Sequence, residues 1–261
     1  MTAASKIERQ RSHFNAIAER YEAGRQEANH RRIKALIWQA ARPFLAPHAG
    51  RRLAMLEAMC GYAEGREIAG EHLGLDCEYH GFDYSDVIVA EMTRRLGEGK
   101  IWQADATSYV PPAEAYDLVL LIGGLHHVPD HAGAVVRQLA EGLKPGGIFA
   151  NFEPTSGNWL FKAVREAIYR RNPIFDEATE RAFAVGELKG FFAAAGLEEV
   201  KTFFPGLIAY TLYYNPYAFP LLNRGGEKWV DFCFAIDRLL MHSWLGRVLS
   251  FATVSIWRKR D

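Results

Sequence analysis

The sequence has no surplus of charge of either sign, few cysteines and no long apolar run. Lys and Arg total 31, as do Asp and Glu, so the basic excess that drives binding to nucleic acid is absent. Its three cysteines (Cys60, Cys77 and Cys233) form no CxxC pair, which favours reduced thiols in the cytoplasm over a disulfide framework. The polar N-terminus also lacks the apolar core of a signal peptide. We therefore expect a cytoplasmic protein that acts without nucleic acid.

A membrane-spanning helix is not expected either, because no uncharged run reaches the roughly 18 apolar residues that spanning requires. The nearest candidate is the segment 206–222, which contains Asn215, Pro216 and Pro220. This segment reads as an apolar cap over a pocket or as a surface that touches lipid. Hydrophobic residues make up 49% of the 261 residues, enough for a sizeable core.

What is present begins with two expected helices within residues 5–46. Phe14, Ile17 and Tyr21 share one helical face, and Ile33, Ile37 and Ala40 form a second apolar stripe. Pro43 and Pro47 are expected to end this region. We interpret residues 1–46 as a helical lid.

Strands and helices then alternate from residue 52 onward. Apolar runs predict strands at 53–58, 77–83, 101–103, 116–122 and 148–153, and helical periodicity predicts helices between them. Repeated β-α units predict a doubly wound parallel sheet. A helix at 183–195 and strands at 200–204 and 252–258 follow, interrupted by an aromatic-rich insertion at 205–247. The expected domains are a core of residues 47–204 and 248–261, with the insertion as a cap that forms part of a pocket.

A glycine-containing turn follows the first of these strands. The segment LEAMCGYAEG carries Glu57 at the strand end and Gly61 in the bend, while Met59 and Ala63 stand where glycine is expected. Ligands of open α/β sheets bind outside the carboxyl ends of the strands, where glycine allows close approach of the backbone. The turn is either the corner of a cofactor site or an ordinary strand–helix connection.

Two acidic residues end the next two strands. Asp83 is placed to accept hydrogen bonds from both hydroxyls of a ribose, and its alternative role is to cap the helix that starts at Ser85. Asp105, in the run QADA, lies where an adenine ring would sit, and its alternative role is an Asx-turn. Their order along the chain favours the ligand-binding roles.

The strongest strand, 116–122, leads into the run GGLHHVPD. Gly123 permits close approach to a cofactor, and His126 and His127 can face reacting groups with side chains that titrate near neutral pH. Either histidine alternatively makes a structural hydrogen bond to backbone. His131 is nearby, but no pattern of cysteines or carboxylates completes a ligand set, so we expect no metal site.

Together these elements resemble the class I S-adenosylmethionine-dependent methyltransferases over about residues 50–155. The strand-acid-glycine turn, GFDYS at 81–85, QADA at 103–106, YDLVLLIGGLHHVPD at 116–130 and LKPGG at 143–147 follow that family's motifs in order. The resemblance implies a Rossmann-like seven-stranded sheet with an antiparallel last strand, and S-adenosyl-L-methionine as the methyl donor. The cofactor-binding residues it implies are Glu57, Met59, Gly61, Asp83, Tyr84, Asp105, Ala106 and Gly123.

The expected reaction is an in-line methyl transfer to oxygen, nitrogen or carbon of a small, apolar or aromatic acceptor. Tyr21, His126 and His127 are the predicted catalytic residues, which would position or deprotonate the acceptor. One alternative is C-methylation of a prenyl or lipid-like phosphorylated acceptor held by Arg165, Arg170 and Arg171. Another is a non-catalytic binding protein whose site Met59 has closed. Monomer and homodimer remain equally open.

Overall fold

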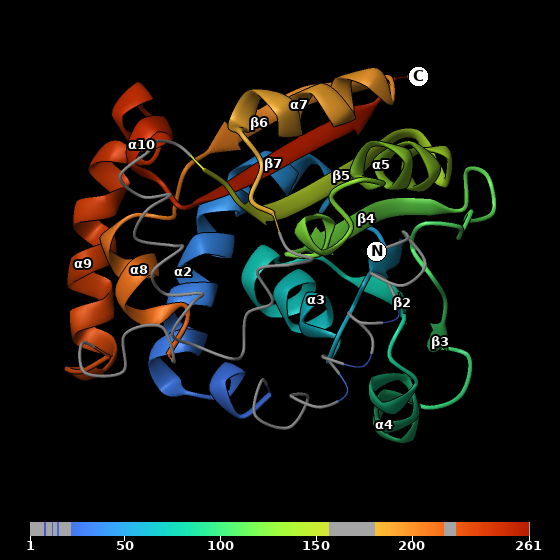
Figure 1. Ribbon diagram of the computed structural model, residues 1–261, viewed down its shortest axis with the longest axis horizontal. Coiled ribbons are helices and arrows are strands. Elements are labelled where there is room, and N and C mark those ends of the chain that lie inside the picture. The colour runs from blue at the N-terminus through green and yellow to red at the C-terminus, as the bar shows by residue number, and fades with distance from the viewer. Residues whose placement is uncertain are drawn as a thin grey trace.

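The computed structural model describes residues 8, 12, 15, 22–156, 181–216 and 223–260. A single sheet runs through them, with helices on both faces (Figure 1). Its strands are β1 (Leu53–Ala58), β2 (Cys77–Asp83), β3 (Ile101–Gln103), β4 (Tyr116–Ile122), β5 (Leu143–Pro154), β6 (Leu197–Phe203) and β7 (Ala252–Lys259).

The strand order is β3-β2-β1-β4-β5-β7-β6, with β7 antiparallel to both of its neighbours. The other pairings, from β3 through β5, are all parallel. The order reverses direction between β1 and β4, so the crevice for a ligand lies at the carboxyl ends of these two strands. The predicted Rossmann-like, seven-stranded fold with an antiparallel last strand is confirmed.

Helices cover the sheet in two groups. The helices described are α2 (Ala28–Leu45), α3 (Glu64–Glu67), α4 (Asp86–Leu96), α5 (Ala132–Glu141), α7 (Val185–Ala194), α8 (Ile208–Tyr213), α9 (Gly226–Leu240) and α10 (Trp244–Leu249). A π-helical stretch, Ile68–Leu73, continues α3, and short 3-10 turns span Ala46–His48 and Leu125–His127. One core cluster joins the sheet to α2, α4, α8 and α9, and the other joins it to α5 and α7.

Alternation along β1 explains how one strand serves both clusters. Leu53 and Met55 belong to the first cluster and Leu56 and Ala58 to the second, because successive side chains of a strand point to opposite faces. A strand buried on both faces therefore reads as a continuous apolar run, and this makes β1 and β4 recognisable in the sequence.

Three predicted boundaries shift. Pro43 lies inside α2, because Ala41 and Leu45 on either side of it are buried and hold the last turn against the core. β5 begins at Leu143, which pairs with Tyr116 ahead of a register irregularity. β6 begins at Leu197, earlier than its apolar residues predict, because it is an edge strand paired only with β7 and carries exposed polar side chains.

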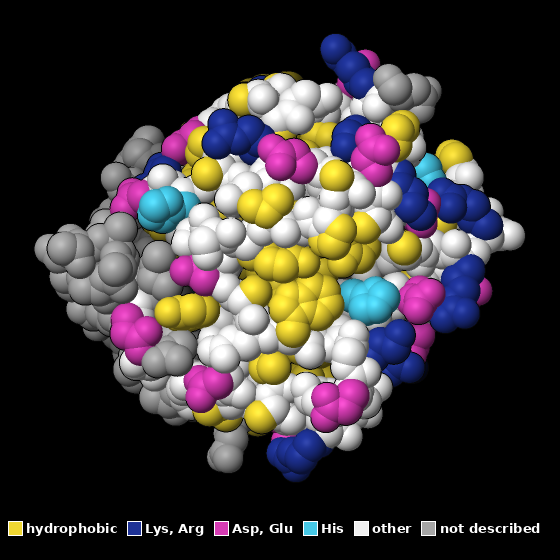
Figure 2. All heavy atoms as spheres, turned by 90° about the vertical axis from the view of Figure 1, so that its right-hand side faces the viewer, with side chains coloured by type: hydrophobic (Ala, Val, Ile, Leu, Met, Phe, Trp, Pro, Cys, Tyr) yellow, Lys and Arg dark blue, Asp and Glu magenta, His cyan; other side chains and the backbone are white. Residues whose placement is uncertain are grey.

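The opposite edge of the sheet is the short strand β3. Phe82 of β2 packs against Tyr109, with ring centroids 4.5 Å apart, and against Trp102 of β3 at 6.3 Å. Figure 2 shows the face at the right of Figure 1, where hydrophobic side chains gather near the centre with a histidine beside them. Aromatic packing thus protects an edge that has only three strand residues.

Candidate functional site

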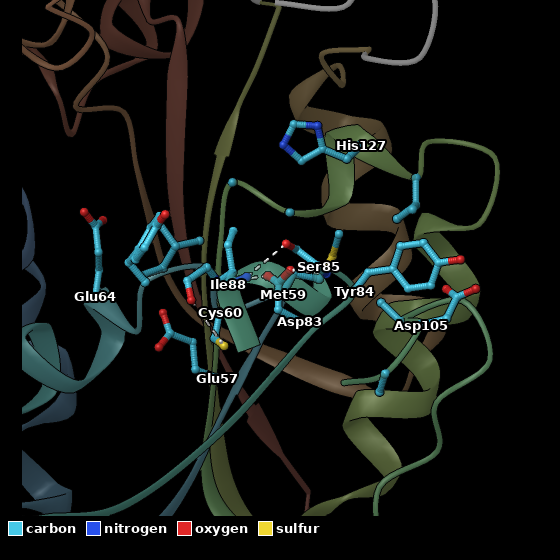
Figure 3. A pocket seen from close by; sticks show the side chains of 18 of the residues that line it. Glu57, Met59, Cys60, Glu64, Asp83, Tyr84, Ser85, Ile88, Asp105 and His127 are labelled. Atoms are coloured by element: carbon cyan, nitrogen blue, oxygen red, sulfur yellow. Dashed lines mark hydrogen bonds between the residues drawn. The ribbon is translucent and has the colours of Figure 1, made fainter. Parts of the chain in front are cut away.

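A cavity opens at the carboxyl ends of β1, β2 and β4, where the strand order predicts a ligand. The empty space inside it and at its open mouth, part of which is bulk solvent, amounts to about 1160 Å³. All eight predicted cofactor-binding residues line it, and so does His127 (Figure 3). Residues far apart in the sequence thus line the same cavity.

The turn after β1 owes its shape to three residues with left-handed backbone. Met59, Gly61 and Ala63 have φ angles of 54°, 49° and 58°. Glycine adopts this conformation readily, whereas other L-residues pay about 1–2 kcal/mol each. Glycine is expected from the sequence at positions 59 and 63, and both positions have the left-handed backbone that favours glycine. Met59 and Ala63 adopt it under strain.

Glu57 is a buried carboxyl beneath this turn. Its Oε1 accepts a hydrogen bond from Gly65 N at 2.9 Å and its Oε2 from the Tyr79 hydroxyl at 2.5 Å. Burial raises the pKa of Glu57 to about 8. A Cβ at Gly65 would lie 2.6 Å from Glu57 Cδ, so glycine is required there. Glu57 therefore fixes the start of α3 as well as lining the cavity.

Asp83 ties the ends of β1 and β2 together. Its Oδ2 accepts from Gly61 N and its Oδ1 from Ser85 N, both at 2.9 Å. Ser85 in turn caps α4 by accepting from Ile88 N. Burial raises the pKa of Asp83 above its ordinary value. A carboxylate can accept about four hydrogen bonds, so two backbone donors leave capacity for ligand hydroxyls.

Asp105 forms the Asx-turn that was predicted as its alternative role. Its Oδ1 accepts from both the backbone N and the hydroxyl of Thr107 at 2.8 Å. Both bonds use the same oxygen, and Asp105 and Ala106 still line the cavity. Figure 3 places Asp105 beside Tyr84, on the side of the cavity away from Glu57 and Glu64. The structural role and the ligand-binding role are therefore compatible.

The loop after β4 is organised by the buried side chain of Glu153 on β5. Glu153 Oε1 accepts from Gly124 N and Leu125 N at 2.8 Å, and Oε2 lies 2.9 Å from His126 Nδ1. Burial raises the pKa of Glu153 to about 7. His126 is thus held against Glu153 and is not among the residues that line the cavity, whereas His127 is. The two rings are tilted to each other by 41°, with centroids 3.9 Å apart.

A charged wall that sequence reasoning missed borders the cavity near α3. Arg25 and Glu64 both line it, with Arg25 Nη1 3.8 Å from Glu64 Oε2. Lys34 on α2 is 2% exposed and lies 3.7 Å from Glu64 and 3.4 Å from Glu67. Burial opposes ionisation of Glu64, but Arg25 and Lys34 outweigh it and lower its pKa. An acid just after the glycine turn was a usable signal for Glu64, whereas nothing local marked Arg25.

Other predicted residues lie elsewhere. Tyr21, the third predicted catalytic residue, lies outside the described residues, as do Arg165, Arg170 and Arg171. Tyr210, Tyr213 and Tyr214 of the insertion are buried in the core rather than lining the described part of the cavity. Trp229 and Phe232 are exposed on α9. The described part of the cavity therefore gains no wall from the described aromatic residues of this insertion.

The described residues hold neither a cluster of metal ligands nor a membrane-spanning helix. No group of three or more His, Cys, Asp or Glu side chains in this part of the chain is arranged to hold a metal ion. No described helix is both long enough and apolar enough to cross a membrane.

Comparison with known proteins gives matches of two kinds. A family model described as a methyltransferase domain matches residues 55–147. A demethylmenaquinone methyltransferase of Listeria welshimeri is 28% identical over 203 residues, covering 72% of this chain and 73% of that protein. Relatives of the same name in Listeria monocytogenes match over 64% of their length.

Solved structures share the fold at low sequence identity. An S-adenosylmethionine-dependent methyltransferase of Thermotoga maritima superposes with a TM-score of 0.60 at 16% identity, covering 95% of this chain and 99% of that one. Another from Archaeoglobus fulgidus gives a TM-score of 0.56 at 17% identity, covering 87% and 94%. Both likenesses extend beyond the segment that the family model matches.

Proposed function

Because the chain belongs to the class I S-adenosylmethionine-dependent methyltransferases, we propose that it transfers a methyl group to a small, apolar or aromatic acceptor. The observation that carries this proposal is the make-up of the cavity. Asp83 and Asp105 supply carboxylates to it, while Met59, Ile122 and Val128 supply apolar wall. One ligand with hydroxyls and amines and a second, apolar ligand would suit these two kinds of lining.

The residues present fit the cofactor that the family implies. Asp83, with unused acceptor capacity, would bind the ribose hydroxyls, and Asp105 with the backbone of Ala106 would bind the adenine. Glu57 and Gly61 would flank the methionine end, where Arg25 and Glu64 also offer opposite charges. Tyr84, which also lines the cavity, would pack against the ring system.

When bound, S-adenosylmethionine supplies a methyl group already activated by a sulfonium sulfur. The protein's own task is then to orient the acceptor in line and to exclude water. His127 is the titratable imidazole that lines the cavity, so it would accept a proton from an acceptor hydroxyl or protonated amine. His126, held by Glu153, would position His127 through the contact between their tilted rings.

The acceptor class is supported by the relatives as well as by the cavity wall. Their name, demethylmenaquinone methyltransferase, denotes an acceptor that fits the apolar, aromatic class proposed here. The alternative of a phosphorylated, prenyl-type acceptor depends on Arg165, Arg170 and Arg171, and no described contact supports it.

The cofactor assignment is tested by calorimetric titration of the full chain with S-adenosylmethionine and its demethylated product. We expect Asp83→Asn to weaken binding by about 10- to 100-fold, because charge-assisted hydrogen bonds contribute about 1.5–3 kcal/mol. Asp76→Asn is the matched control, since Asp76 is exposed and outside the cavity. Absence of binding by the wild type would overturn the proposal.

The acceptor is tested by methyl transfer from labelled cofactor to a panel of apolar phenols, quinols and amines. We expect turnover of at least one aromatic member that falls in His127→Ala and Tyr21→Phe. Transfer only to hydrophilic acceptors, from a protein that binds the cofactor, would contradict the acceptor class and leave the methyltransferase assignment standing.

A further inference from the structure

Helix α9 carries apolar side chains on two opposite faces. Val230, Phe234 and Met241 are 0%, 3% and 3% exposed and pack into the core. Trp229, Phe232, Ile236 and Leu239, which we call the α9 outer face, recur at intervals of three and four residues and so share one side. At 3.6 residues per turn the two sets lie on roughly opposite sides of the helix.

The α9 outer face is open to solvent. Trp229 is 57% exposed, Phe232 56% and Leu239 79%. Figure 1 shows α9 at the outer boundary of the molecule, on the far side of α2 from the β3 edge, with α10 at its end. α10 adds two more exposed apolar side chains, Trp244 and Leu245, at 72% and 40%. Exposed apolar side chains grouped in this way mark an interaction surface.

The charges around these side chains are mainly basic. Arg224, Lys228, Arg238 and Arg247 lie within or next to α9 and α10, and all four are exposed. The acidic side chains nearby are engaged elsewhere. Asp231 accepts from Arg32 Nε at 2.6 Å, and Asp237 is buried and accepts from the backbone N of Ala209 at 2.8 Å. The remaining carboxylate of this helix, Glu227, also lies near Arg32.

From this arrangement we propose that the α9 outer face, with Trp244 and Leu245, docks onto the surface of an anionic lipid bilayer. Amphipathic helices bind such surfaces by burying apolar side chains while Lys and Arg contact anionic headgroups. Tryptophan suits the boundary between headgroups and acyl chains because its ring is apolar and its N–H is polar. This site is distinct from 206–222, where the sequence placed lipid contact, because Tyr210, Tyr213 and Tyr214 of that segment are buried.

Charge favours a lipid surface over a second copy of the chain. A symmetric dimer through α9 would gather the basic side chains of both copies around one interface, and like charges across an interface oppose association. An anionic bilayer meets both features of the face at once, the apolar side chains and the basic ones. The inference goes beyond the proposed function, because it holds whatever the acceptor is.

Co-sedimentation of the full chain with vesicles tests the proposal. We expect binding to vesicles that contain phosphatidylglycerol and much weaker binding to phosphatidylcholine alone. The triple variant Trp229→Gln/Phe232→Gln/Leu239→Gln should lose binding by roughly tenfold or more, since each burial of a large apolar side chain is worth that much. Lys228→Gln/Arg238→Gln should lose the preference for anionic vesicles.

The matched control is Val110→Gln/Val200→Gln, which removes apolar side chains that are 55% and 40% exposed outside α9 and α10. It should bind like the wild type. All replaced side chains are exposed, so folding should persist, and the single variant Leu239→Gln serves if the triple variant unfolds. Absence of wild-type binding, or equal binding by the triple variant, would refute the proposal. A wild-type dimer that the triple variant converts to monomer would assign the face to a second copy instead.

Discussion

Met59 fills the space that a side chain at Gly124 would need. A Cβ at Gly124 would lie 2.8 Å from Met59 Sδ and 3.2 Å from Met59 Cβ. The turns after β1 and β4 therefore pack against one another, with the large side chain in the turn after β1 and the glycine in the turn after β4. Both residues line the cavity, so Met59 shapes it without closing it.

This fit predicts a compensating pair of substitutions. Gly124→Ala should destabilise the fold by about 1–3 kcal/mol through overpacking and should weaken cofactor binding. Met59→Gly in the same chain should recover most of the loss, because it removes the clashing atoms and relaxes a left-handed φ. Denaturant midpoints of the four proteins of this cycle measure the coupling. Additive effects would show that the two turns are independent.

Stability should fall as pH rises from 7 to 8. Burial raises the pKa of Glu57 to about 8 and of Glu153 to about 7, whereas both titrate near 4.5 when unfolded. Above 4.5 the folded chain thus binds more protons than the unfolded chain, so raising pH favours unfolding until the folded pKa is passed. Each group contributes at most about 1.4 kcal/mol per pH unit.

Urea unfolding at several pH values measures this slope. Burial lowers the pKa of His30 to about 3. A histidine whose pKa is lowered by folding changes stability only below its ordinary pKa, near 6.5. Above pH 7 the slope therefore reports the two glutamates and not the histidine. Glu57→Gln imitates the protonated form and should flatten the profile, whereas Asp76→Gln should leave it unchanged. An identical slope in Glu57→Gln would contradict the assignment.

Replacing each of the two neighbouring histidines should affect a different property, stability in one case and turnover in the other. His126→Ala removes the partner of a buried carboxyl and should lower the free energy of unfolding by about 1–3 kcal/mol. His127→Ala should keep its unfolding midpoint while turnover falls by about 10²- to 10⁴-fold if it is the general base. Unfolding curves and turnover of both variants decide the matter. Loss of turnover in His126→Ala but not in His127→Ala would contradict the assignment of His127 as the base.

Lys34 should be a large contributor to stability despite its charge. Its ammonium is buried beside Glu64 and Glu67, so Lys34→Ala removes the cation next to Glu67, leaves Glu64 with Arg25 alone, and should cost about 3 kcal/mol. Arg95→Ala is the comparison, since Arg95 pairs with Glu22 and Glu91 at the surface and should cost under about 1 kcal/mol. Equal costs by chemical denaturation would mean that the buried network adds nothing.

The sequence by itself determined the sheet and the carboxylates that line the cavity. β1 and β4 are buried on both faces and read as apolar runs, and the residues at the carboxyl ends of parallel strands must meet at one edge. Glu57, Asp83 and Asp105 were therefore identifiable from order alone. Met59 was identifiable as an anomaly because a tight turn needs left-handed backbone.

Only the tertiary structure decided what depends on contacts between distant segments. It separated His126 from His127, since the partner of His126 comes from β5, 27 residues further along the chain. It paired Met59 with Gly124, brought Arg25 beside Glu64, and sorted the aromatic residues of the insertion into buried ones and the exposed α9 outer face. Periodicity identifies an apolar side chain, but packing against the rest of the chain decides whether that side chain is buried or left for a partner.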